Sequence, residues 1–322
     1  MPPTTSSKKK SKKKKRSENK ISVNSKNESK LYQALLTLLH TPRRYEAIAP
    51  VIDQFGLERN LSRNGLNRLE ARVISEGLNK VKLHWKSAYK ASTDLYSSLP
   101  SNEANPLEIA VAFHARSYLC FQTALFWNDL TEQVPRTFFV AQERPGTSSK
   151  TVAPESFDEF ELRDTFVKLP KEHPNVATFG EYRFIFLARA YTGNAGVESR
   201  QILFKGKEVP TLITGLERTL LDCISVPENA GGISNVVDAI KRSVDRIQID
   251  LLIDLYRQLE FKYPHWQRVG LLLERVGALK YVNKWRAHFG APKNKFYLCK
   301  GYKLGWELDE SWSVYFPPGL FK

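Results

Sequence analysis

Apolar residues recur at helical spacing in the N-terminal third of the chain, which predicts three short helices there. The first is built around 31–39, the second covers about 45–55 and ends at Gly56, and the third follows Ser62 and runs to about residue 76. Ser62 is a suitable N-cap and Gly77 a suitable stop. The buried stripes are Leu31, Leu35, Leu38 and Leu39; Ile48, Val51, Ile52 and Phe55; and Leu66, Leu69, Val73 and Ile74.

Residues 81–90 alternate weakly between apolar and polar, which indicates a short β-hairpin or wing. Three helices followed by a wing are typical of a winged helix-turn-helix domain. We therefore predict a disordered arm over 1–28, a winged helix-turn-helix DNA-binding domain over 29–95 and a larger mixed α/β domain over 96–322. The expected fold class is α+β.

The larger domain mixes strand and helix patterns. Strands are predicted over 137–141, 182–190, 201–204, 208–213 and parts of 296–316, with a polar loop over 146–158. Helices are predicted over 107–113, 117–130, 233–244, 250–259, 266–276 and 281–289. Thr214 and Glu217 have the spacing of a capping box, so another helix is expected to begin there.

The predicted regions differ in net charge. The chain of 322 residues has a net charge of +15, of which +9 lies in 1–30, +5 in 31–90 and only +1 in 91–322. A polyanionic partner is therefore expected at the N-terminal part, and the larger domain is expected to do something other than contact nucleic acid.

The polar face of the third predicted helix is rich in Arg and Asn, whose donors match the major-groove edges of guanine and adenine. These residues are Arg63, Asn64, Asn67, Arg68 and Arg72, and we predict that they bind DNA. Flanking cations suited to phosphates are Arg43, Arg44, Lys80, Lys82, Lys86 and Lys90. The alternative is an ordinary solvated basic face of a surface helix.

The first 28 residues are of low complexity and offer no apolar surface for a core. Their cations form a predicted arm that binds nucleic acid without sequence preference: Lys8, Lys9, Lys10, Lys12, Lys13, Lys14, Lys15 and Arg16. A solubilising tail or a nuclear-import signal would have the same composition.

Several functional classes are disfavoured. No apolar run is long enough to span a membrane, no secretory signal is present, and three separated cysteines fit a reducing compartment, so the expected location is the cytoplasm. No phosphate loop, HExxH, CxxC or GxSxG motif occurs. Glu260-Phe261-Lys262 has the tripeptide of metal-dependent nucleases, but it ends a predicted helix and not a strand. We therefore predict that the protein is not an enzyme and that it has no catalytic residue, metal or cofactor. A cryptic nuclease is the third hypothesis, after the two given below.

Two parts of the larger domain resemble AbiEi-type antitoxins. The first comprises the segments 96–100, 106–110, 118–125 and 130–135. The second is the element Glu217-Arg218-Thr219-Leu220-Leu221-Asp222, followed by Pro227, Gly231-Gly232-Ile233 and the segment 268–274. The resemblance covers roughly residues 95–280. It departs from the family where Trp127-Asn128-Asp129-Leu130 replaces the common His-Gly-Leu, and in the Lys-rich arm.

The resemblance implies the antitoxin half of a type IV toxin–antitoxin pair that acts in phage defence by abortive infection. Such proteins bind inverted repeats in their own promoter, repress the operon and counter a nucleotidyltransferase toxin without necessarily forming a stable complex with it. The alternative is a protein-interaction module of a defence system, with an RNA-binding arm and no promoter role. The element Glu217–Asp222 can also be explained by a structural role alone. In that interpretation Leu220 and Leu221 lie in the core, and Arg218 and Asp222 form an i, i+4 pair.

Overall fold

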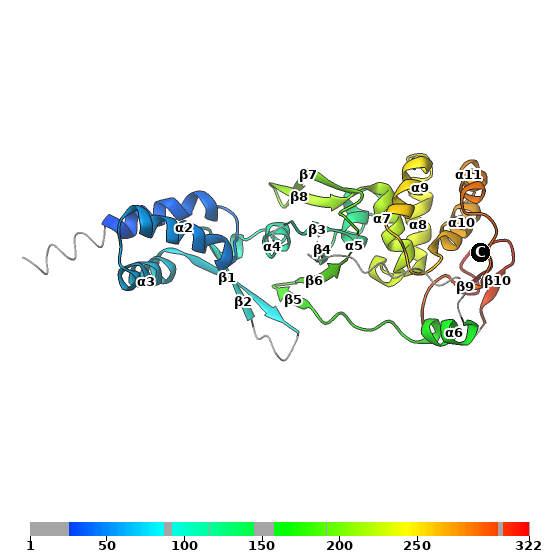
Figure 1. The fold of residues 1–322 in the computed structure, drawn as a ribbon, viewed down its shortest axis with the longest axis horizontal. Coiled ribbons are helices and arrows are strands. Elements are labelled where there is room, and N and C mark those ends of the chain that lie inside the picture. The colour runs from blue at the N-terminus through cyan, green and yellow to red at the C-terminus, as the bar shows by residue number, and fades with distance from the viewer. Residues whose placement is uncertain are drawn as a thin grey trace, which may run out of the picture. The chain divides into compact units, whose positions relative to one another are not determined.

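A computed structural model of the chain describes residues 26–86, 92–114, 116–144, 158–190, 192–301 and 305–321. It has a mixed α/β fold that divides into two compact units (Figure 1). The first unit takes in residues 1–83 and 92–113, and the second takes in 84–91 and 114–322. Within the described ranges, every helix is too short or too polar to cross a membrane.

The first unit consists of a helix over 26–39 and the elements that follow it. These are α2 (Tyr45–Glu58), α3 (Arg63–Arg72), a π-helical turn (Val73–Gly77), β1 (Asn79–Trp85), β2 (Ser92–Ser97), a 3-10 turn (Ser101–Glu103) and α4 (Pro106–Ala112). Strand β1 pairs with β2. Between the first two helices, Arg43 forms an isolated antiparallel bridge with Tyr96, with both backbone hydrogen bonds made at 2.9 and 2.7 Å.

The apolar stripes predicted from the sequence form the core of the first unit. Leu31, Leu35, Leu39 and Ile48 are fully buried, and they pack with the buried residues of α3. The predicted N-cap is confirmed, since the Oγ of Ser62 accepts the N–H of Gly65 at 3.2 Å.

The predicted end of the second helix at Gly56 is wrong, because α2 continues to Glu58. Gly56 is buried, and a Cβ there would lie 2.6 Å from Cδ2 of Leu66 on α3. The glycine therefore serves the close approach of two helices and not a helix stop. The chain reverses after it at Asn60, whose φ is +48°.

The second unit is built on a mixed sheet. Its strands are β3 (Tyr118–Leu119), β4 (Thr137–Glu143), β5 (Val176–Phe179), β6 (Tyr182–Arg189), β7 (Val197–Phe204) and β8 (Lys207–Thr214). Hydrogen-bonded neighbours among these six strands follow the order β5-β6-β4-β3-β8-β7. The pairs β4–β6 and β3–β8 are parallel, whereas β5–β6, β3–β4 and β7–β8 are antiparallel.

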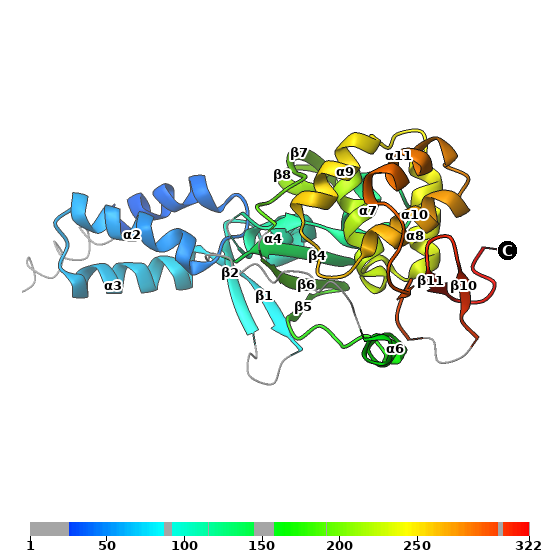
Figure 2. The same ribbon diagram turned by 45° about the vertical axis from the view of Figure 1, so that its right-hand side comes forward.

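Helices cover this sheet and form most of the core. They are α5 (Phe121–Trp127), α7 (Leu216–Ser225), α8 (Ile233–Ser243), α9 (Ile249–Gln258), α10 (His265–Arg275) and α11 (Leu279–Phe289). Figures 1 and 2 show α7–α11 gathered beside the strands. Phe139 and Ile185 pair across β4 and β6 and face the helical core, while Phe138 stacks on Phe184 on the opposite face. Apolar contacts on both faces explain the continuous apolar run in β4.

The C-terminal part adds a small second sheet of β9 (Phe296–Tyr297), β10 (Glu307–Asp309) and β11 (Val314–Phe316), in the order β10-β11-β9. Helix α6 (Glu159–Val167) packs on it through Phe166, whose ring lies 5.1 Å from that of Phe296. The polar loop predicted over 146–158 lies outside the described residues except for Asp158. Asp158 caps α6 by accepting the N–H of Glu161 at 2.9 Å.

Two further predictions for the second unit are wrong. The expected helix over 117–130 begins only at Phe121, because Tyr118 and Leu119 form a buried central strand between β4 and β8. The capping box at Thr214 is absent: Gly215 is the N-cap of α7, and no side chain caps it. Thr214 bonds Thr219 at 2.7 Å instead.

Candidate nucleic-acid interface

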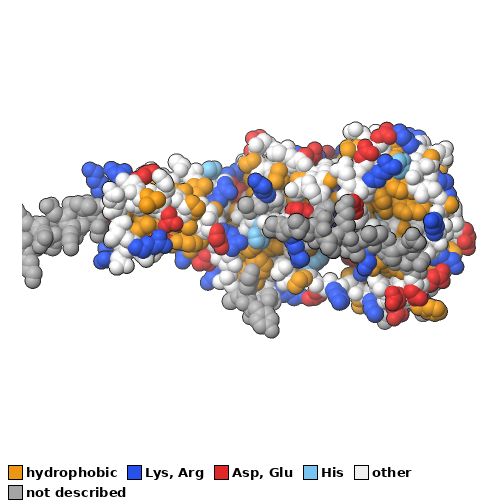
Figure 3. Space-filling model, viewed as in Figure 1, with side chains coloured by type: hydrophobic (Ala, Val, Ile, Leu, Met, Phe, Trp, Pro, Cys, Tyr) orange, Lys and Arg blue, Asp and Glu red, His pale blue; other side chains and the backbone are white. Residues whose placement is uncertain are grey.

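The polar face of α3 is exposed along its length. All five residues predicted from the sequence to read DNA lie on it and are exposed: Arg63, Asn64, Asn67, Arg68 and Arg72. At about 100° per residue these positions occupy one half of the helix surface, opposite Leu66 and Leu69. Figure 3 shows Lys and Arg side chains over the part of the surface formed by α2 and α3, with acidic side chains among them.

Three of these residues already make local contacts. Arg63 pairs with Asp53 at 3.1 Å, and Arg72 pairs with Glu28 at 2.5 Å. The hydrogen bond and charge of Glu28 raise the pKa of Arg72. Arg68 donates from Nε to the carbonyl of Asn64 at 3.2 Å, which holds its guanidinium along the helix. Exposed ion pairs contribute only about 0–1 kcal/mol, so phosphates or bases could replace these carboxylates at low cost.

The flanking cations differ in their surroundings. Arg44 pairs with Glu46 at 2.6 Å and lies over the ring of Phe113, and Lys80 lies 3.6 Å from Asp94. Lys82 is exposed, and Arg43 is half-buried with an Nε that lacks a hydrogen-bond partner within the described protein.

The remaining basic residues predicted to contact nucleic acid lie elsewhere. Lys86 belongs to the second unit, where it pairs with Glu172 at 2.5 Å. Lys90 and the arm residues Lys8–Arg16 lie outside the described residues. The first unit therefore contains the five residues of α3 together with Arg43, Arg44, Lys80 and Lys82, but not the whole predicted set.

Two contacts of α3 were missed by sequence reasoning. Glu28, which had been assigned to the arm, lies on the first helix and reaches Arg72. Tyr45 on α2 donates to Glu70 on α3 at 2.5 Å, and this hydrogen bond raises the pKa of Tyr45 to about 12. Both pairs join positions far apart in the chain, so no local pattern could have indicated them.

The element that carries the family resemblance lies in the second unit, on α7. Its Leu220 and Leu221 are buried in the core, and its Arg218 and Asp222 form the expected i, i+4 ion pair at 3.2 Å. Asp222 also pairs with Arg189 of β6. Burial opposes the charge of Arg189, but Asp222, Cys120 and Tyr118 together outweigh burial and raise the pKa of Arg189. Glu217 accepts the N–H of Gln248 at 2.8 Å, so it caps α9 and not its own helix.

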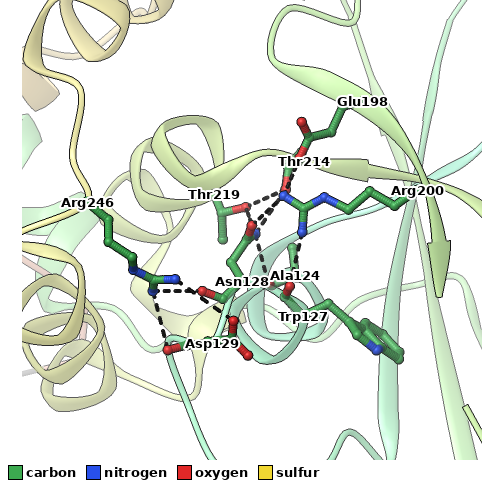
Figure 4. A network of polar contacts seen from close by, with 9 residues as sticks. All are labelled: Ala124, Trp127, Asn128, Asp129, Glu198, Arg200, Thr214, Thr219 and Arg246. Carbon is green, nitrogen blue, oxygen red and sulfur yellow. Dashed lines mark hydrogen bonds and ion pairs between the residues drawn. The ribbon is translucent and has the colours of Figure 1, made fainter. Parts of the chain in front are cut away.

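The segment that departs from the family lies against this element (Figure 4). Asn128 is 4% exposed, and its Nδ2 lies 3.0 Å from both the carbonyl of Thr214 and the hydroxyl of Thr219. Its Oδ1 accepts a hydrogen bond from Arg200 at 2.9 Å, and its carbonyl accepts one from Arg246 at 2.8 Å. Asn128 thus ties α5 to the start of α7.

Among the described residues, no group of three His, Cys, Asp or Glu side chains is arranged to hold a metal ion. Cys120, Cys223 and Cys299 are buried, and burial raises the pKa of each thiol, that of Cys299 to about 12. The thiols are therefore protonated at neutral pH and poor nucleophiles.

Comparison with known proteins gives no family. No family model matches the chain, and no curated protein matches it. Among solved structures, the chain is similar to the crystal structure of the Rv2827c protein from Mycobacterium tuberculosis, with 13% identity and a TM-score of 0.45. The match covers 86% of this chain and 94% of that one.

Proposed function

We propose that the protein is a DNA-binding transcriptional regulator and antitoxin of AbiEi type. The observation that carries the DNA-binding part is the exposed Arg and Asn face of α3. Five side chains with base-reading or phosphate-binding chemistry lie there on one rigid helix, whose opposite face is fixed in a core. Arg and Asn donate in pairs to guanine and adenine edges, and the major groove admits one helix.

The order of elements supports this reading. The chain runs from the helix over 26–39 through the Arg43–Tyr96 bridge to α2, α3, β1 and β2. Helix, short strand, helix, helix and two strands is the order of winged helix-turn-helix domains, in which the third helix enters the major groove. In this proposal α3 is the recognition helix, the chain between β1 and β2 is the wing, and Lys8–Arg16 add contacts to phosphates.

The DNA target proposed is an inverted repeat in the promoter of the protein's own operon, occupied by two copies of the chain. The antitoxin part rests on the resemblance of residues 95–280, whose most specific element forms the buried side of α7. The proposed functional partner is a nucleotidyltransferase toxin, which need not be bound in a stable complex.

The DNA-binding part is tested by fluorescence anisotropy with the promoter fragment and the full chain. Substituting Arg68→Ala together with Arg72→Ala is expected to weaken specific binding by about 2–6 kcal/mol if both arginines reach bases, at about 1–3 kcal/mol each. If they reach only phosphates, binding weakens on all DNA and the salt slope falls by about 0.9 per contact.

The matched control is Arg257→Ala with Lys293→Ala, which removes the same charge from exposed positions of the second unit. Its binding should stay near that of the parent. Equal weakening in both double variants would show that the loss of net charge alone causes the effect. Unchanged binding in the α3 variant would refute the recognition-helix assignment. Binding of RNA that depends only on residues 1–28 would favour the interaction module instead.

The antitoxin part is tested separately by co-expression with the nucleotidyltransferase that this proposal expects to be encoded beside it. Growth should be restored by the parent and by the Arg68→Ala, Arg72→Ala variant when both are expressed from a foreign promoter. Failure of both to restore growth would remove the antitoxin role and leave the DNA-binding proposal intact.

A further inference from the structure

The second unit contains a cavity of about 920 Å³. Its wall is formed by the end of α6 and the chain after it (165, 166 and 168–171), by β4 and β6, by the end of α7 and the residues after it (225–229), and by the start of α10. Cavities that hold drug-sized ligands measure about 300–1,000 Å³, so the space suits a ligand much larger than one inorganic phosphate.

The lining of this cavity is strongly cationic, although the unit as a whole is almost neutral. Five basic side chains border it, against the single carboxylate of Glu228: Lys168, Lys171, Arg183, Arg268 and Lys300. In the described part of the chain, Lys168, Lys171 and Arg183 have no carboxylate within ion-pair distance, although the charge of Arg183 contributes to lowering the pKa of Glu172. Clustered like charges around a concave surface raise the local concentration of anions.

Arg268 is the most unusual of these cations because it is only 1% exposed. It donates to three backbone carbonyls, those of Tyr297 at 2.7 Å and of Ile224 and Ser225 at 3.0 Å, and it lies over two aromatic rings. No described carboxylate pairs with it. Burial lowers its pKa to about 10, which leaves it charged at neutral pH. Buried charges are normally paired, whereas this guanidinium has only the more distant charge of Glu228 acting on it, beyond ion-pair distance.

Two histidines add polar groups to the same wall. The Nδ1 of His265 is buried and has no hydrogen-bond partner within the described protein, and the residue is 7% exposed. Burial lowers the pKa of His265 well below its ordinary value, so the ring is neutral and offers one N–H and one lone pair. His173 is oriented by a 2.8 Å hydrogen bond to Asn229.

We propose that this cavity binds a nucleoside polyphosphate. The phosphates would lie among Lys168, Lys171 and Arg183, with Arg268 and His265 in the wall behind them. Aromatic rings of Phe139, Phe166 and Tyr263 also line the cavity and suit the base and ribose. An inorganic anion would satisfy the cations but leave most of the volume empty. The proposal is independent of the DNA-binding function.

The experiment is isothermal titration calorimetry of the full chain with ATP, GTP, CTP and UTP, and with inorganic triphosphate and adenosine as partial probes. At least one nucleotide is expected to bind in a 1:1 complex, about tenfold or more tighter than either partial probe. The variant Lys171→Gln with Arg183→Gln is expected to raise the Kd of that nucleotide about tenfold or more, because charge-assisted hydrogen bonds are lost. Both residues are exposed, so their substitution should leave the fold intact.

The matched control is Lys241→Gln with Arg257→Gln, two exposed cations of the same unit that do not line the cavity. Its Kd should stay within about twofold of the parent, and thermal unfolding should be the same for parent and variants. No binding of any nucleotide at about 1 mM would overturn the proposal. So would equal weakening in both double variants, or inorganic triphosphate binding as tightly as the best nucleotide.

Discussion

Replacing Asp222 by Asn should strongly destabilise the second unit. Asp222 is fully buried, and its two oxygens face the guanidinium groups of Arg218, also fully buried, and of Arg189, whose side chain is 24% exposed. The substitution keeps the size of the side chain but removes the only carboxylate among the described residues that pairs with either arginine. Two neighbouring cations then remain without a counter-charge.

The size of the effect follows from burial. Removing one partner of a buried ion pair costs about 3–5 kcal/mol because the other charge stays desolvated. Water reaches part of Arg189, which places the expected loss near the lower limit, at about 3 kcal/mol. For a unit of this size, about 2–4 °C of Tm is lost per kcal/mol, so the Tm should fall by roughly 6–12 °C.

Tryptophan fluorescence isolates this unit, since all six Trp residues lie in 84–91 and 114–322. Urea unfolding followed by this signal gives the free energy of unfolding of the second unit alone. The control is Asp238→Asn, which breaks an exposed 3.9 Å pair with Lys241 and should cost less than about 0.5 kcal/mol. A loss below about 1 kcal/mol for Asp222→Asn would refute the view that its charge holds the two arginines.

Three other predictions follow from single contacts. Gly270→Ala should cost at least about 1–3 kcal/mol in the same urea assay, because its Cβ would lie 2.1 Å from the buried ring of Trp312; an unchanged midpoint would contradict this packing. Ser62→Ala should cost about 1 kcal/mol through loss of the α3 cap, measured as faster amide exchange in α3, with Gly65 the first to lose protection. His265 is neutral in the folded state, so unfolding takes up a proton below pH 6.5. Stability should therefore fall by about 1.4 kcal/mol per pH unit below that value, and His265→Gln should remove this slope; an identical slope in the variant would show that other groups cause it.

Local pattern predicted most helices and half of the sheet, and its errors have physical causes. The spacing of Leu31, Leu35 and Leu39 identifies a helix, because residues four positions apart lie on the same face of a helix and this face packs in the core. Tyr118 and Leu119 were assigned to a helix because a strand buried on both faces has no alternation to read. Gly56 was read as a stop, since nothing in the local sequence tells a glycine at a helix crossing from one at a helix end.

The exposed face of α3 was predictable for the same reason that its core face was. Residues left over from an apolar stripe must face solvent, so Asn64, Asn67 and Arg68 could be named from spacing alone. The partners of these residues could not be named. Glu28 and Arg72 are 44 positions apart, and only the folded packing of the first helix on α3 brings them together.

The net charge of a chain segment does not describe the charge around a cavity that folding creates. A net charge of +1 over 91–322 indicated a domain without affinity for polyanions. Folding gathers Lys171, Arg183, Arg268 and Lys300 from separate segments around one cavity, and Glu228 is the single carboxylate in its lining. Electrostatic attraction acts over roughly 10 Å at ordinary ionic strength, so a ligand responds to the local cluster and not to the sum. Overall neutrality is therefore no argument against an anionic ligand of the second unit, and the nucleotide titration decides between the two descriptions.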